Sequence, residues 1–133
     1  MEEHERRQIN SPSVAAPRGH FSHAVVAQDT IYVSGLLAFD DKGVITAPGD
    51  VRGQTQRIFE ILEHILHEAR ATLADTVQLT TYVTDIGQRA PVNEVRKQLF
   101  GTCRPASTLV EVSALAAEGA VIEIDAIAVR TRA

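Results

Sequence analysis

The pattern that most constrains the fold is an apolar run near the C-terminus, V-I-E-I-D-A-I-A-V, at Val121–Val129. Because side chains alternate between faces along a strand, Glu123 and Asp125 share one face, and the other face is apolar throughout. Four residues form that apolar face: Ile122, Ile124, Ala126 and Ala128. The run therefore predicts a strand with one face on a core and two acids on the other.

The two carboxylates in this run need an explanation. Negative charge inside an apolar strand is costly unless the carboxylate is paired, protonated, or facing a cleft or a subunit interface. An edge or interface strand whose acids reach water accounts for Asp125. For Glu123, a structural role of that kind and a functional role both stay open at this point.

Composition narrows the class of protein. With 133 residues, of which 44% are hydrophobic and 23% charged, the chain is long enough for one buried core, and we expect a single soluble globular domain. A net charge of −4 and 5% aromatic residues provide neither a basic surface nor stacking platforms, which argues against a nucleic-acid partner. The single cysteine, Cys103, rules out an internal disulfide and is typical of a reducing compartment, so we expect a cytoplasmic protein.

The N-terminal residues differ from the rest of the chain. M-E-E-H-E-R-R-Q-I-N-S-P is charged and contains no apolar stretch, so it is neither a secretory signal nor a membrane span. We expect residues 1–18 to form a tail or an irregular entry strand, and residues 19–133 to form the domain.

Hydrophobic periodicity predicts the elements of that domain. Asp50 is a good N-cap for a long helix, and Pro91 opens a second helix that Gly101 ends, with Val92, Val95 and Leu99 on its buried face. Strands are expected at 23–27, 31–35, 76–83, 107–113 and 121–129. The order is β-β-α-β-α-β-β, an α+β layer of two helices packed on one mixed sheet.

Several side chains are candidates for chemistry. Gly35 breaks the second strand, which indicates a bulge, a close approach to the backbone or an ordinary strand end. Asn93 and Arg96 lie three residues apart and can both point away from the core. His64 and His67 have the spacing of a metal pair, although a solvated helix face explains them equally well, and we expect no metal.

Two helices leave the other sheet face uncovered, so we expect a closed homo-oligomer with sites between subunits.

Four segments match a known family in order and spacing. They are G-H-F-S-H-A-V followed by I-Y-V-S-G, then A-P-V-N-E, R-P-A-S-T-L-V-E-V and I-E-I-D-A-I-A-V. Together, from about Gly19 to Arg130, they resemble the reactive intermediate deaminase family, also called the YjgF or RidA family. The resemblance implies a chorismate-mutase-like fold and a homotrimer with small-molecule clefts at the subunit interfaces. It also implies hydrolysis of enamines and imines, such as 2-aminoacrylate, to the keto compound and ammonia without metal or organic cofactor.

The same resemblance assigns the site residues. The family's catalytic glutamate falls on Glu123, and its cleft-lining residues fall on Ser34, Gly35 and Asn93. Leu109 and Phe21 are further candidates for substrate contact, and Phe21 stands where deaminating members have a tyrosine.

One departure from the family concerns the substrate's carboxylate. Deaminating members read P-A-R and bind that carboxylate with the arginine, whereas this chain has Ser107 there, and a serine cannot supply the charge. Arg96 or Arg104 are the alternatives for a relocated anion contact.

Two kinds of function follow from the resemblance and this departure. The first is an enamine or imine deaminase with an altered substrate preference, in which the carboxyl group of Glu123 serves as general acid and base. The alternative is a trimer that binds a small metabolite without turnover, or a chaperone-like interaction protein.

Overall fold

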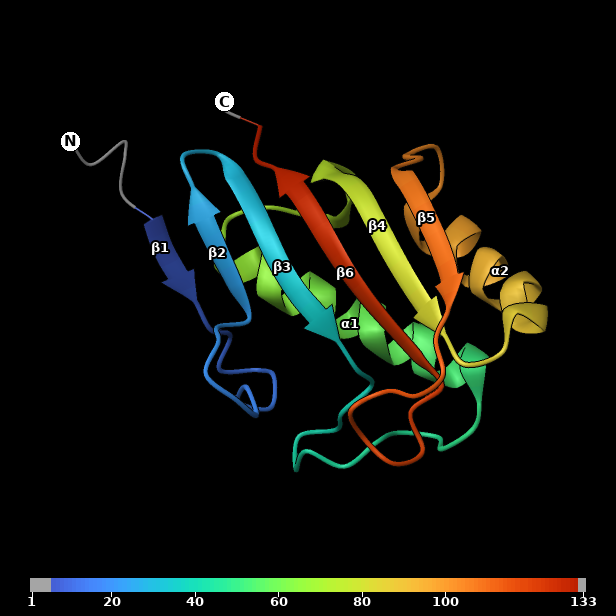
Figure 1. The fold of residues 1–133 in the computed structure, drawn as a ribbon. Coiled ribbons are helices and arrows are strands. Elements are labelled where there is room, and N and C mark those ends of the chain that lie inside the picture. Colours follow the sequence, from blue (N-terminus) through green and yellow to red (C-terminus); the bar gives the residue numbers. More distant parts are fainter. Residues whose placement is uncertain (1–5, 132–133) are drawn as a thin grey trace.

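The computed structural model describes residues 6–131, which form one six-stranded mixed sheet with two α-helices on one of its faces (Figure 1). The strand order is β1-β2-β3-β6-β4-β5, and all neighbours are antiparallel except β4 and β5. The strands are β1 (Arg6–Ile9), β2 (Ala24–Ala27), β3 (Thr30–Leu36), β4 (Thr76–Val83), β5 (Ala106–Glu111) and β6 (Ile122–Val129). The α+β class is therefore confirmed.

Strand β6 is the predicted two-faced strand, and it lies in the middle of the sheet between β3 and β4. Its apolar face is at most 2% exposed and packs in the main core. Glu123 lies opposite Tyr82 and Asp125 lies opposite Thr80 on β4, and both acids are half-buried. The alternation read from the sequence is confirmed residue by residue.

The two helices cover the apolar face. Helix α1 (Val51–Glu68) begins as expected at Asp50, whose side chain accepts a hydrogen bond from the Gly53 N–H at 3.2 Å. Helix α2 (Arg89–Phe100) begins two residues before Pro91 and ends at Gly101. Leu99 was expected to be buried, and this is wrong, because it is 42% exposed. Phe100 is buried in its place, and its ring packs edge-to-face against that of Phe59, with 5.1 Å between the ring centroids.

The start of the sheet also differs from the expected order. Residues 6–9, within the stretch expected to be a tail or an entry strand, form β1 and pair with β2, so the order is β-β-β-α-β-α-β-β. Ile9 is buried in the core, which explains why this short strand docks. Residues 1–5 of the expected tail lie outside the described residues.

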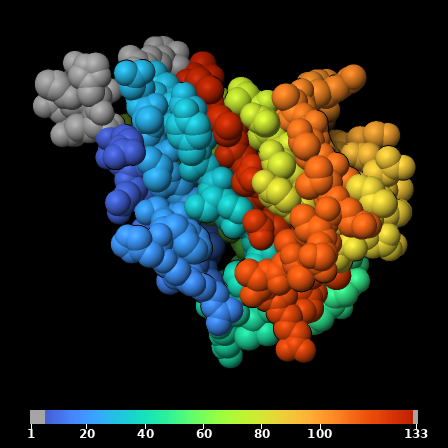
Figure 2. All heavy atoms as spheres, in the orientation of Figure 1, coloured from blue at the N-terminus to red at the C-terminus, as the bar shows by residue number. Residues whose placement is uncertain are grey.

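Within residues 6–131, no helix covers the second face of the sheet. Figure 2 shows this face, with β2, β3, β6, β4 and β5 side by side. Tyr32, Val110 and Val129 are 50%, 40% and 41% exposed. No described helix is long and apolar enough to cross a bilayer.

A buried amide fixes the position from which β6 starts. The Nε2 of Gln54 on α1 donates to the carbonyls of Ala47, at 3.1 Å, and Gly119, at 2.8 Å. Its Oε1 accepts from the Val121 N–H at 3.0 Å. One fully buried side chain makes all three contacts, so it holds the loop before α1 and the loop before β6 together. The contact with Val121 lies two residues before Glu123.

Candidate functional site

Glu123 lies directly over the backbone of Gly35. The pairing of β3 with β6 shifts register between Val33 and Leu36, so Gly35 lies in a β-bulge. A Cβ on Gly35 would overlap Oε2 of Glu123 and lie 2.9 Å from its carboxyl carbon. Of the three interpretations left open for Gly35, the structure supports the bulge and the close approach, and what approaches is the carboxyl group of Glu123.

Ser34 ties the end of β3 to the loop before β2. Its hydroxyl donates to the Ser22 carbonyl at 2.7 Å, and its N–H donates to the His23 carbonyl at 3.0 Å. This places Phe21, which is 54% exposed, at the same pocket as Ser34 and Glu123.

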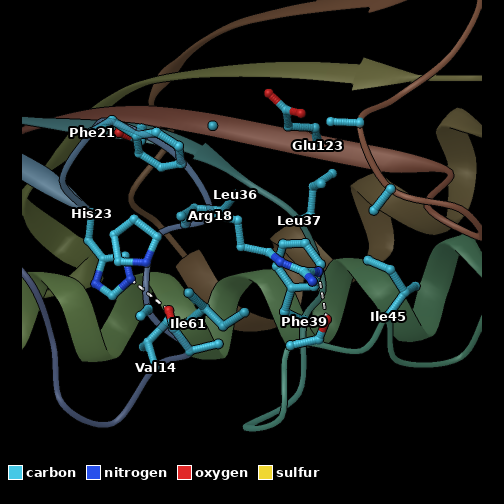
Figure 3. A pocket seen from close by; sticks show the side chains of 18 of the residues that line it. Val14, Arg18, Phe21, His23, Leu36, Leu37, Phe39, Ile45, Ile61 and Glu123 are labelled. Atoms are coloured by element: carbon cyan, nitrogen blue, oxygen red, sulfur yellow. Dashed lines mark hydrogen bonds between the residues drawn. The ribbon is translucent and has the colours of Figure 1, made fainter.

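The pocket at Glu123 is large and mostly apolar (Figure 3). Its volume is about 880 Å³, at the upper end of the range for small-molecule sites. Its charged lining residues are Arg18, Glu118 and Glu123. His23 also lines it, but its ring is held by the backbone, since Nδ1 accepts from Ser11 N–H at 3.0 Å and Nε2 therefore donates to the Ala15 carbonyl at 2.8 Å.

The electrostatics of the pocket centre on two acids of β6. Burial raises the pKa of Glu123, and the negative charge of Asp125 raises it further. Asp125 is held in place by the Tyr82 hydroxyl, which donates to it at 2.8 Å, and this hydrogen bond raises the pKa of Tyr82. Glu123 thus keeps its proton to higher pH than an ordinary glutamate, as a general acid requires.

A second pocket, of about 670 Å³, lies between α2 and the start of β5. Asn93, Arg96, Arg104 and Ser107 all line it. The guanidinium of Arg96 donates to the Ser107 hydroxyl at 2.9 Å. Burial lowers the pKa of Arg96, whose guanidinium nevertheless stays charged, and within residues 6–131 no carboxylate pairs with it.

The expected site residues therefore fall into two groups in one chain. Phe21, Ser34, Gly35 and Glu123 line the first pocket, and Asn93, Arg96 and Ser107 line the second. Ser107 lies opposite Leu79, whose side chain is buried under the helices, whereas Glu123 is on the uncovered face. The sheet thus separates the two groups within a chain. Leu109 packs against the core and lines neither pocket.

Two residues of the sites were missed by sequence reasoning. Arg18 lines the first pocket from an irregular stretch with no periodicity to place it. Tyr82 could have been found, since strand parity in T-V-Q-L-T-T-Y-V separates it from the buried Leu79, Thr81 and Val83.

Comparison with known proteins decides the family. Residues 11–130 match the family described as Endoribonuclease L-PSP. The chain belongs to this family. A RutC family protein of Pyrococcus abyssi is 38% identical over 84% of this chain and 87% of its own length. A 2-iminobutanoate/2-iminopropanoate deaminase of Capra hircus is 34% identical over 94% of this chain and 90% of its own.

Solved structures of similar chains share the fold. RidA from an Antarctic Psychrobacter has a TM-score of 0.86 at 31% identity, and the match covers 92% of this chain and 98% of the RidA chain. Escherichia coli TdcF with bound serine has a TM-score of 0.85 at 28% identity, with 94% and 99% covered. The resemblance seen in the sequence motifs is thereby confirmed at the level of the family.

The raised pKa of Glu123 makes a prediction about stability. The folded chain binds this proton more tightly than the unfolded chain, so the free energy of unfolding decreases as pH rises from the ordinary glutamate pKa of 4.5 through the higher folded value. Between about pH 4 and pH 7, we expect the free energy of unfolding to decrease less in Glu123→Gln than in wild type, because the contribution of this carboxyl group is lost. Urea unfolding at both pH values measures the difference. Glu63→Gln, an exposed change on α1, is the control. Equal pH dependence in wild type and Glu123→Gln would contradict the assignment.

Proposed function

We propose that this protein is an enamine or imine deaminase, which hydrolyses its substrate to a carbonyl compound and ammonia with Glu123 as general acid and base. The observation that carries the proposal is the half-buried carboxyl group of raised pKa on the wall of a large apolar pocket. The Capra hircus relative, named as a 2-iminobutanoate/2-iminopropanoate deaminase, supports this reaction class.

The chemistry uses one carboxyl group twice. Protonated Glu123 gives its proton to the β-carbon of an enamine, which becomes an iminium ion, and the resulting carboxylate takes a proton from the water that attacks the iminium carbon. Protonated Glu123 then returns that proton to the amine nitrogen. Ammonia leaves as the hydroxyl of the intermediate gives its proton to the carboxylate, which forms the carbonyl compound and restores protonated Glu123. Gly35 makes this possible sterically, because only a residue without a Cβ leaves room for the carboxyl group.

We propose that the complete site forms between copies of the chain in a homotrimer. Within one chain the side chain of Glu123 and that of Ser107, which contacts Arg96, point to opposite faces of the sheet. The uncovered face, with its exposed Tyr32, Val110 and Val129, is the surface available for association. Association would place Asn93 and Arg96 of one copy beside Glu123 of the next.

In this arrangement Arg96 takes over the anion contact that Ser107 cannot provide. Its guanidinium is charged, partly desolvated and oriented by the hydroxyl of Ser107. Ser107 is the residue that stands where the deaminating members of the family have an arginine. The charge comes from a helix instead of from β5, so the bound carboxylate has a different position relative to Glu123. This supports an altered substrate preference.

A trimer that binds a metabolite without turnover would use the same pockets. Product formation distinguishes the deaminase from such a binding protein.

The family description names an endoribonuclease, but a net charge of −4 and a pocket wall bearing Glu118 and Glu123 do not favour binding of a phosphate backbone.

Replacing the carboxyl group tests the acid–base role. We expect Glu123→Gln to reduce ammonia release from 2-aminoacrylate generated in place by roughly 10²–10⁴-fold in kcat. Glu63→Gln should retain wild-type turnover. Unchanged kcat in Glu123→Gln would remove this residue from the mechanism.

Replacing Arg96 tests the anion contact. Arg96→Met keeps the length of the side chain and loses the charge, so we expect kcat/KM to fall about 10–100-fold, mainly through a higher KM. Arg89→Met, on the exposed first turn of the same helix, is the matched control. A KM equal to that of wild type would show that Arg96 does not bind the substrate.

A further inference from the structure

The pocket of Glu123 contains a positive charge that the proposed reaction does not use. Arg18 lines it from the stretch between β1 and β2. Figure 3 shows the Arg18 guanidinium next to Phe39, on the other side of Leu37 from Glu123. Among residues 6–131 no carboxylate pairs with Arg18, Glu123 included.

The guanidinium is held in a defined place. Its carbon lies 5.1 Å from the centre of the Phe39 ring, within the range of a cation–π contact. One terminal nitrogen donates to the Gly43 carbonyl at 2.9 Å. A guanidinium has five N–H donors, so most of them remain available for a ligand.

The platform below Arg18 is itself anchored. The carbonyl of Phe39 accepts from Nε of Arg57 on α1 at 2.8 Å, and Phe39 forms a β-bridge with Ile45. The turn at Gly43 is closed by its N–H, which donates to the Asp40 carbonyl at 3.0 Å. The charge is therefore presented from an ordered surface, which lowers the entropy lost when a ligand binds.

The wall between the two charged groups is apolar. Leu37 lies between them in Figure 3, and Leu36, Phe39, Val44 and Ile45 also line the pocket. A ligand whose reacting carbon is at Glu123 meets these side chains before it reaches Arg18. A three-carbon imino acid occupies only a small part of about 880 Å³.

We infer that Arg18 is a specificity-determining residue and that the substrate carries a second anionic group. The substrate class is a 2-imino or 2-enamino acid with a carboxylate at the end of an apolar chain or ring, bound by Arg18. This inference rests on the proposed function for the reacting end, where Arg96 binds the first carboxylate, and adds a contact at the far end.

Binding of stable keto acids tests the inference without turnover. 2-Oxoadipate and 2-oxohexanoate have the same six-carbon chain, and only the first carries a second carboxylate. By isothermal titration calorimetry at low salt, we expect wild type to bind 2-oxoadipate at least about tenfold more tightly than 2-oxohexanoate. Arg18→Gln should lose this preference and keep the affinity for 2-oxohexanoate, and Arg18→Lys should recover part of the preference.

Several controls keep the result interpretable. Arg52 on α1 is an exposed arginine that pairs with Glu94 on α2, and Arg52→Gln should keep the wild-type preference. Equal loss of both ligands in Arg18→Gln would show that Arg18 only holds two loops together, and would overturn the inference. A preference retained in Arg18→Gln, or absent in wild type, would overturn it as well. Because no turnover is measured, failure of the deaminase proposal would appear separately, in the kcat of Glu123→Gln.

Discussion

The close approach of the Glu123 carboxyl group to the Gly35 backbone is the contact on which the site depends. It exists because β6 is a central strand whose apolar face is buried under two helices, which leaves its acids on the opposite face. A strand of this kind cannot slip by one residue, since slippage would bury both acids in the core. Packing on one face therefore fixes the position of the carboxyl group on the other.

The charges around Glu123 are arranged so that none of the described cations neutralises it. Its neighbour on the same face is Asp125, held by Tyr82, and Arg18 in its own pocket lies against Phe39 and donates to Gly43 instead of pairing with Glu123. Burial and like charge both favour the protonated acid. A salt bridge at this position would have stabilised the carboxylate and removed the proposed general acid.

Much of this arrangement is readable from the residues, and the exceptions have physical reasons. Alternation in β6 and the Asp50 cap are local signals, and both were predicted correctly. Strand β1 is not a local signal, because R-R-Q-I becomes a strand only by pairing with β2. At the end of α2, Leu99 and Phe100 compete for one space, and the larger ring fills it against Phe59. The separation of Glu123 from Ser107 depends on the register of three strands, which no single segment encodes.

The central claim is that Glu123 and Arg96 act together from different copies of the chain, and subunit complementation tests it most directly. Glu123→Gln and Arg96→Met would each be assayed alone at low substrate, then mixed in equal amounts under conditions that allow subunits to exchange. If each site takes Glu123 from one copy and Arg96 from its neighbour, about a quarter of the sites in random mixed trimers are intact, and activity should rise to about that fraction of wild type. If the mixture stays as inactive as its components, the two residues do not form a shared site, and the account is wrong.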